Sequence, residues 1–208
     1  MNRSLASVST GLAALALALV PASPSSPAPA STASASPAAP APGDSGRTTR
    51  VVLRVDGCQD RCEVQLVQAF EGRSFVWSST RKRTTDGVVR FRVPSRRTTG
   101  MSIELTPPWH RQNYIPVVAV HYAGMSDGEQ VSAREAARSR RAYGCLEGTR
   151  SPRLRLDVQV DRFRSRGVTG DIVDTARVYS EETLPALAPL KRTLRGSLGG
   201  QEALYCER

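Results

Sequence analysis

The residues that could form a hydrolytic site are few, and their order along the chain argues against one. Residues 124–128 read Gly-Met-Ser-Asp-Gly and match the G-x-S-x-G pattern of a nucleophile elbow, a sharp turn between a strand and a helix. Hydrolases built on this elbow need a histidine after the serine, yet both histidines, His110 and His121, precede it. The next helix is expected to begin at Ser132, not at the serine of the motif. We therefore interpret residues 124–128 as a polar turn.

Acid–base chemistry has no recognised spacing among the other titratable residues. His110 adjoins Trp109 and His121 adjoins Tyr122, which is typical of packing or surface positions. A carboxylate pair for glycoside hydrolysis is defined by its separation in space, which a sequence does not show. The sequence thus predicts no catalytic residue, no cofactor and no metal. A wall-polymer hydrolase with a non-standard site is the alternative function, and a cleft joining a histidine to a carboxylate would favour it.

Four cysteines, which allow three pairings, predict a disulfide framework in an exported chain. Cys58 and Cys62 flank a tight connection between two predicted strands, so we expect them to pair. That leaves Cys145 to pair with Cys206, which would hold the C-terminus to the end of a predicted helix. Zinc is the alternative, because the C-x3-C spacing lies within its range, but the second half of the chain lacks a close ligand pair.

The charge of the chain favours an anionic partner. Lys and Arg number 29 against 19 Asp and Glu, for a net charge of +10, and only Lys82 and Lys191 are lysines. Such an excess suits anionic wall polymer, anionic lipid headgroups or extracellular DNA. A genome rich in GC, or simple solvation of strand faces, would also explain so many arginines. We predict a compact polyanion-binding patch at Arg134, Arg138 and Arg141, which share one helix face.

Arginines on the predicted strands alternate with apolar residues and must point outward. They could belong to different sheets, so the helix trio is the more compact prediction. The strand positions in question are Arg90, Arg92, Arg153 and Arg155.

Aromatic residues on a β-protein can contact a ligand. Trp109 and Tyr114 lie in the polar loop 107–114 and are the candidates for exposed ligand contacts, with packing of the loop as the alternative. Trp77 alternates with Phe75 at strand spacing, which indicates a core position.

The elements that must position these residues follow a period of two. We predict a mainly β protein, an antiparallel β-sandwich of about eight strands with one or two short helices. Asp86-Gly87 predicts a tight hairpin turn. A capping box at Ser132–Glu135 begins a helix that runs to about residue 142, and residues 184–194 are a second helix candidate. The predicted strands are 50–55, 62–70, 74–80, 89–93, 101–105, 115–122, 154–160 and 172–179.

The N-terminal segment indicates where the protein works. A basic residue, the apolar run 11–20 and small residues around Ala22 predict a signal peptide over residues 1–22. Residues 23–46 are rich in Pro, Ala and Ser and predict a disordered, semi-rigid spacer, although compositional drift is the alternative. Residues 47–208 then form a single disulfide-bonded domain with no membrane span. We expect a secreted, extracellular protein, associated with the cell wall.

The order of strands and turns resembles a known class of domains. Residues 51–105, with the segment Asp-Gly-Val-Val-Arg-Phe-Arg-Val-Pro at 86–94, resemble prealbumin-like and immunoglobulin-like sandwiches. The whole pattern, including residues 140–149 and Cys206, is similar to secreted actinobacterial proteins of unassigned function. The resemblance implies a β-sandwich and no catalytic residue; the predicted helix after Ser132 and the region after Cys145 depart from a simple seven-stranded sandwich.

These observations favour an exported, non-enzymatic binding or structural module of the cell envelope that recognises an anionic polymer. Export makes intracellular nucleic acid an unsuitable partner.

Overall fold

The computed structural model describes residues 46–58, 61–68, 77–139 and 142–187. Every described residue belongs to one compact unit within residues 41–208. The predicted signal peptide and spacer lie outside the described residues, apart from Gly46. The described part is mainly β, as the sequence predicts.

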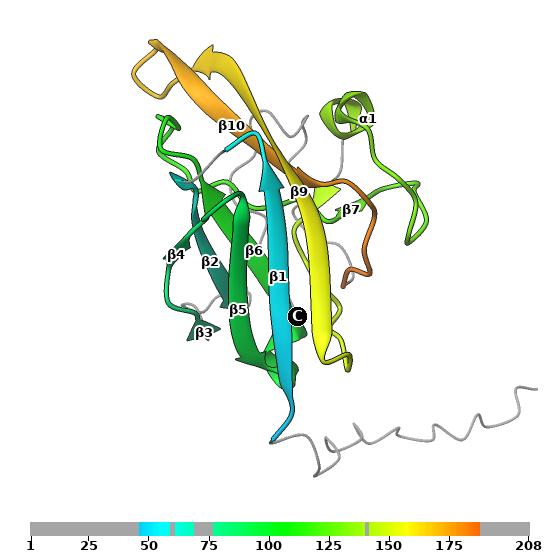
Figure 1. Cartoon of the computed structure of the whole chain (residues 1–208). Coiled ribbons are helices and arrows are strands. Elements are labelled where there is room, and N and C mark those ends of the chain that lie inside the picture. The colour runs from blue at the N-terminus through cyan, green and yellow to red at the C-terminus, as the bar shows by residue number, and fades with distance from the viewer. Residues whose placement is uncertain (1–45, 59–60, 69–76, 140–141, 188–208) are drawn as a thin grey trace, which may run out of the picture. The chain divides into compact units, whose positions relative to one another are not determined.

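The first sheet contains four strands in the order β10 (Ile172–Ser180), β9 (Arg153–Arg166), β1 (Thr48–Asp56) and β5 (Val88–Pro94), as Figure 1 shows. β9 pairs antiparallel with β10, and β1 pairs antiparallel with β5, but β1 and β9 run parallel. The prediction of a purely antiparallel arrangement is therefore wrong. Parallel neighbours need a long crossover, and here the chain between β1 and β9 passes through all the other strands except β10.

The second sheet is centred on β2 (Glu63–Gln68) and is antiparallel. Along one edge, β2 pairs with β6 (Met101–Thr106) over its whole length. The short strands β3 (Trp77–Ser78) and β4 (Lys82–Arg83) both pair with the other edge of β2. A separate pair joins β7 (His121–Tyr122) to β8 (Ala142–Tyr143). A 3-10 turn, η2 (Ser95–Thr98), follows β5.

One hydrophobic core is shared by the two larger sheets. Alternate residues of β1, Val51, Leu53 and Val55, are buried and belong to the same cluster as Leu66 of β2 and Ile103 of β6. Burial of each such side chain stabilises the fold by about 1.5–3 kcal/mol. The alternation also fixes which residues of β1, β5 and β9 face solvent.

Residues 116–120 connect the edges of the two larger sheets. The Val118 amide donates to Ile103 of β6 at 2.9 Å, and the Ala119 amide donates to Val178 of β10 at 3.1 Å. Both side chains are almost fully buried. The sequence predicts a buried strand over 115–122. Most of the segment is buried, but Ile115 is exposed and only residues 121–122 form a strand, because the hydrogen bonds of the remainder are divided between two edges.

The Asp-Gly hairpin turn is confirmed. Asp86 and Gly87 have φ of 49° and 66°, as a two-residue turn with both central residues left-handed requires. The turn joins Thr85 to Val88 and so leads the chain into β5, which pairs with β1.

The helix α1 (Ala133–Arg138) begins at the predicted capping box. The Ser132 hydroxyl accepts from the Glu135 amide at 3.3 Å, and the Glu135 carboxylate accepts from the Ser132 amide at 2.8 Å. The helix ends before residue 142, earlier than predicted, because Tyr143 pairs with His121 in a strand. Of the second predicted helix, residues 184–187 are not helical, and the rest lies outside the described residues. None of the described helices is long and apolar enough to cross a bilayer.

Candidate functional site

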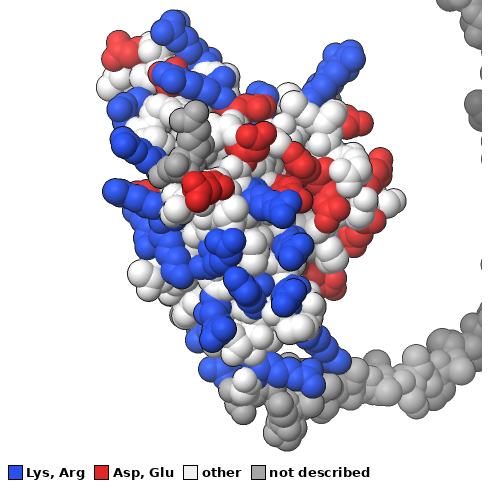
Figure 2. Space-filling model, viewed as in Figure 1, with Lys and Arg blue, Asp and Glu red and all other residues white. Residues whose placement is uncertain are grey.

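Six arginines share the outer face of the first sheet. Each lies on β1, β5 or β9 and alternates with a buried core residue, so each is exposed. The view in Figure 2 shows basic side chains gathered over these strands, and acidic side chains gathered higher up on the side where α1 lies. We call this set the arginine grid, and its members are Arg50, Arg54, Arg90, Arg92, Arg153 and Arg155.

Strand register arranges the grid in rows that cross the sheet. In the first row, Arg50 lies opposite both Arg92 on β5 and Arg153 on β9. Neighbouring strands are about 4.8 Å apart, and residues two apart along a strand are about 6.6 Å apart. The three arginines of this row therefore lie side by side.

The next two rows complete the pattern. Val52 lies between Arg90 and Arg155, and Arg54 lies between Val88 and Asp157. The strand arginines thus share one sheet, and the expectation that they could belong to different sheets is wrong. A shallow hollow of about 220 Å³, lined by five of the six arginines and the two valines, lies within the grid.

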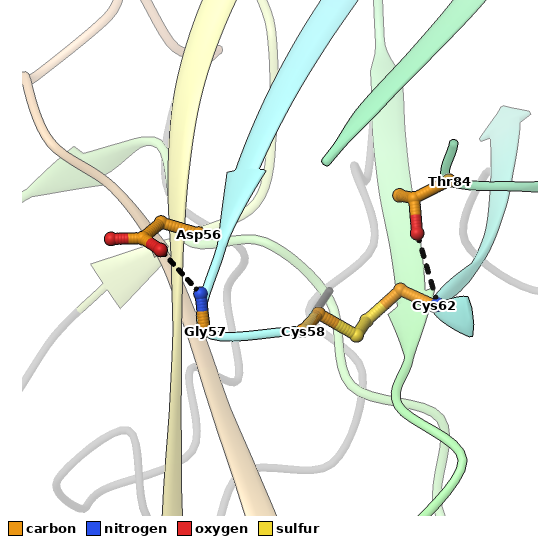
Figure 3. Close-up of a disulfide and its surroundings, with 5 residues drawn as sticks. All are labelled: Asp56, Gly57, Cys58, Cys62 and Thr84. Carbon is orange, nitrogen blue, oxygen red and sulfur yellow. Dashed lines mark hydrogen bonds between the residues drawn. A yellow bond between two sulfur atoms is a disulfide. The ribbon is translucent and has the colours of Figure 1, made fainter. Parts of the chain in front are cut away.

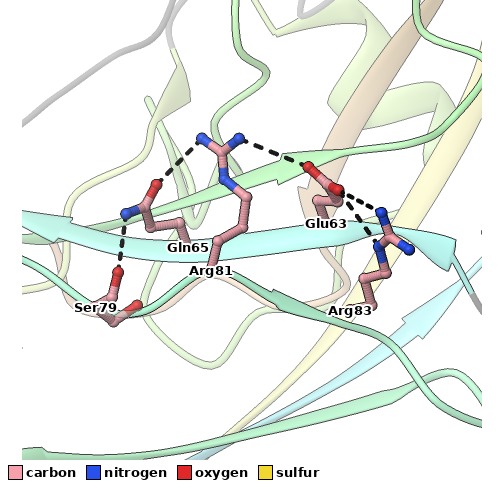
Figure 4. Close-up of polar contacts among 5 residues, drawn as sticks. All are labelled: Glu63, Gln65, Ser79, Arg81 and Arg83. Carbon is pink, nitrogen blue, oxygen red and sulfur yellow. Dashed lines mark hydrogen bonds and ion pairs between the residues drawn. The ribbon is translucent and has the colours of Figure 1, made fainter.

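The guanidinium groups of the grid have no ion pair or hydrogen bond among the described residues. Arginines on the second sheet contrast with them (Figure 4). Arg81 and Arg83 lie 3.6 Å and 3.1 Å from the carboxylate of Glu63, and Arg81 also donates to Gln65 at 3.3 Å. Among the described residues, some arginines thus form ion pairs and those of the grid do not, although Asp157 lies opposite Arg54 at the edge of the grid.

Unneutralised charges at this spacing repel one another. Two unit charges about 5 Å apart repel by about 0.8 kcal/mol in water, and salt weakens the repulsion. Like charges directly opposite on paired strands destabilise a sheet. A polyanion laid across the grid would remove this penalty and form charge-assisted hydrogen bonds with the planar guanidinium groups.

The helix trio predicted as the polyanion site is only partly described. Arg134 and Arg138 are exposed on α1, and Arg141 lies outside the described residues. Glu135 lies between the first two on the helix. The acidic surroundings of α1 in Figure 2 make this region less positive than the grid.

A broad groove of about 1400 Å³ begins where the grid ends. Arg54, Val88 and Asp157, the third row of the grid, line it together with Trp109 and Gln159. The groove and the grid therefore form one continuous surface.

A disulfide forms one wall of the groove (Figure 3). Cys58 and Cys62 are bonded, with Cα atoms 5.9 Å apart, and connect the end of β1 to the start of β2. The Cys62 amide donates to the Thr84 hydroxyl at 3.1 Å, and the Gly57 amide donates to the Asp56 carboxylate at 2.8 Å. The predicted Cys58–Cys62 pairing is confirmed.

The second predicted pairing stays a prediction. Cys145 is buried, and Cys206 lies outside the described residues.

Trp109 and Tyr114, the two predicted ligand contacts, have different surroundings. Trp109 is half-buried, packs against the core and lines the groove, with the Arg162 guanidinium 5.3 Å from its ring centre. Tyr114 is absent from the residues that line the groove, and its ring meets His110 edge-on at 5.1 Å. Burial raises the pKa of Tyr114, whose buried hydroxyl has no partner among the described residues.

The two histidines occupy separate places. His110 is 8% exposed; its Nδ1 accepts from the Ala176 amide at 3.1 Å, so its Nε2 carries the proton and donates to the Tyr114 carbonyl at 2.9 Å. Burial lowers its pKa and favours this neutral form. His121 Nδ1 lies 3.1 Å from the Leu184 carbonyl and 3.3 Å from Asp127.

The G-x-S-x-G segment forms turns, as predicted. Gly124 and Gly128 have φ of 87° and 83°, and the Ser126 amide donates to Glu129 at 2.9 Å. The neighbouring His121–Asp127 contact is of the kind a hydrolase would use, but neither residue lines the groove or the hollow. Neither the groove nor the hollow is lined by a histidine, so neither is a cleft that joins a histidine to a carboxylate.

Searches of protein-family models, curated proteins and solved structures found no match to this chain. Its function has to be inferred from its own residues.

Proposed function

We propose that this chain is an exported, non-enzymatic module of the cell envelope that binds an anionic polymer through the arginine grid. The observation that supports this most directly is the presence of six exposed arginines on one sheet face with no acidic partner among the described residues. Solvated strand faces explain isolated arginines, but they do not explain three in one row while Arg81 and Arg83 are paired with Glu63.

A polymer suits this surface better than a small anion. The grid spreads its six charges over three strands, so they extend beyond the hollow of about 220 Å³ that five of them line. Each phosphate contact releases counterions and adds a modest increment, so a useful affinity needs several contacts on one ligand. The predicted signal peptide and spacer would place the domain where wall polymers occur, and the disulfide agrees with an oxidising compartment.

The scaffold we propose for this function is a β-sandwich. Two sheets that share one core would hold β1, β5 and β9 in fixed register. That register sets the spacing of the arginines.

The test compares two variants with the same change in charge. R50Q/R92Q removes two charges from the grid, and R81Q/R83Q removes two paired charges from the second sheet. Binding to short-chain inorganic polyphosphate is measured between roughly 50 and 300 mM NaCl. In this range the release of counterions makes the affinity fall steeply as salt increases. We expect R50Q/R92Q to weaken binding about tenfold, or about 1.4 kcal/mol, and to reduce the log–log salt slope by roughly 1.5.

The control variant R81Q/R83Q should bind within about twofold of the natural chain, which is about 0.4 kcal/mol. Equal losses in both variants would show that net charge alone attracts the polymer. Absence of salt-dependent binding in the natural chain would contradict the proposal.

A wall-polymer hydrolase is the second candidate, because His121 and Asp127 lie in contact. Incubation of the chain with purified wall polymer, followed by assay of released sugar and phosphate, separates the two functions. Release that H121A abolishes would support the hydrolase; we expect no release from either protein.

A further inference from the structure

The groove beside the grid differs from it in chemistry. The grid is lined by arginines, whereas the groove has more carboxylates than guanidinium groups. Its charged lining residues are Asp56, Asp86, Asp157 and Glu181 against Arg54 and Arg61, and the amide of Gln159 lies with them. Carboxylates repel phosphate, so the groove does not suit the charged part of an anionic polymer. The change in lining occurs within a single continuous surface, because Arg54 and Val88 line both the groove and the hollow within the grid.

We infer that the groove binds the hydroxyl-bearing units, sugar or polyol, of the same polymer whose phosphates contact the arginine grid. This inference rests on the proposed function and names its ligand class: a phosphodiester polymer that alternates anionic and neutral hydroxylated groups.

The groove has the side chains that such neutral units need. Ionised carboxylates only accept hydrogen bonds. One N–H of the Gln159 amide donates to the Glu181 carboxylate, and its other N–H and its oxygen can donate and accept, so together these groups match hydroxyl groups. The part of Trp109 that lines the groove adds apolar surface against which the C–H groups of a sugar or polyol can pack, beside the Arg162 guanidinium that lies over its ring.

The walls of the groove are held in place before any ligand binds. The Cys58–Cys62 disulfide and the tight turn at Asp86–Gly87 both border it. Gly57 packs so closely that a Cβ atom there would overlap the Val160 carbonyl oxygen. A preformed wall reduces the entropy lost when a flexible polymer binds.

The grid and the groove make different demands on a ligand. Inorganic polyphosphate has charge but no hydroxyl-bearing units, so it should contact the grid alone. Poly(glycerol phosphate) adds a polyol, and glucosylated poly(ribitol phosphate) adds a polyol and a sugar.

The test measures these three ligands against W109L and Q159A in the full mature chain. We expect each variant to weaken binding of at least one hydroxylated polymer about fivefold and to leave polyphosphate binding within about twofold, or about 1.0 and 0.4 kcal/mol. Loss with the glucosylated polymer alone identifies a sugar; loss with both identifies the polyol. Because Trp109 packs against the core, the thermal midpoint of each variant is measured, and Q159A decides the result if W109L fails to fold.

Fluorescence provides a readout independent of the loss of binding. In a W77F background Trp109 is the remaining tryptophan, so its emission should shift when a hydroxylated polymer binds and stay unchanged with polyphosphate. The inference is overturned if the variants weaken all three ligands equally, or none of them, while polyphosphate still binds through the grid. If polyphosphate itself does not bind, it is the proposed function that fails.

Discussion

Arg50 on β1 lies directly opposite Arg92 on the antiparallel strand β5, and neither guanidinium group has an acidic partner among the described residues. Arg153 extends the same row on the other side of Arg50. Like charges directly opposite weaken strand pairing. The register of the sheet thus places a repulsive row at the surface where a polyanion would be stabilising.

Salt should therefore stabilise this domain. Screening at high ionic strength weakens repulsion between exposed charges, because the Debye length falls to about 3 Å at 1 M. We expect the thermal midpoint to rise by a few degrees between low salt and about 0.5 M NaCl, consistent with roughly 1 kcal/mol of relieved repulsion. R50Q/R92Q should raise the midpoint at low salt and flatten its dependence on NaCl.

R81Q/R83Q is the matched comparison for this effect. It removes attractive contacts to Glu63, so it should lower stability slightly or leave it unchanged. A natural chain whose midpoint falls with NaCl would show that attraction, not repulsion, dominates its surface.

The sequence is sufficient to predict that the strand arginines point outward, but not that they meet. Alternation of Arg90 and Arg92 with Val89, Phe91 and Val93 indicates the outer face of one strand, and the structure agrees. Meeting depends on which strands pair and in what register.

The pairing that brings the arginines together is the least local in the chain. Arg50 and Arg153 are more than a hundred residues apart and lie on parallel strands, whereas alternation within each strand is the same for any partner. Only a pairing signal between distant strands could have identified the grid. Features that depend on local sequence were predicted correctly. The capping box at Ser132 and the turn at Asp86–Gly87 are each formed by residues only a few positions apart.

Gly57 should tolerate no side chain. Its φ is +79°, and a Cβ atom would overlap the backbone oxygen of Val160. We expect G57A to lower the free energy of unfolding by roughly 2–4 kcal/mol, from left-handed strain and displacement of the backbone together. Gly124 is the control, because its φ is +87° with no atom within 4 Å of an added Cβ.

G124A carries the conformational cost alone, about 1 kcal/mol. Urea unfolding of both variants gives the difference. Equal losses would show that β9 moves away from residue 57 without penalty.

Acid should destabilise the fold through His110. Burial lowers the pKa of His110 in the folded state, so between its usual value near 6.5 and that lower pKa the unfolded chain binds more protons. Stability therefore falls as pH decreases from about 7 through this window. We expect H110Q to have a smaller pH slope of the unfolding free energy than the natural chain, measured by urea unfolding across this window.

The Cys58–Cys62 disulfide closes a short loop, so its removal should have a moderate effect. The loop-entropy relation gives about 2 kcal/mol for C58A/C62A. Peptide mapping without reductant should recover Cys58 linked to Cys62, and it also tests the predicted link between Cys145 and Cys206. A peptide joining Cys58 to Cys145 or Cys206 would contradict the framework.

Charge reversal ranks the two candidate anion-binding surfaces. R90E/R155E changes the second row of the grid, where the two arginines are separated by Val52 and not directly opposite one another. R134E/R138E changes the described part of the helix trio by the same amount of charge.

We expect the grid variant to lose polyphosphate affinity at least tenfold, about 1.4 kcal/mol, and the helix variant to lose less than threefold, about 0.7 kcal/mol. The reason is that acidic residues already offset the charge around α1, whereas the six grid arginines have no partner among the described residues. Isothermal titration at fixed salt measures both, and a larger loss in the helix variant would assign binding to α1 and leave the grid without this role.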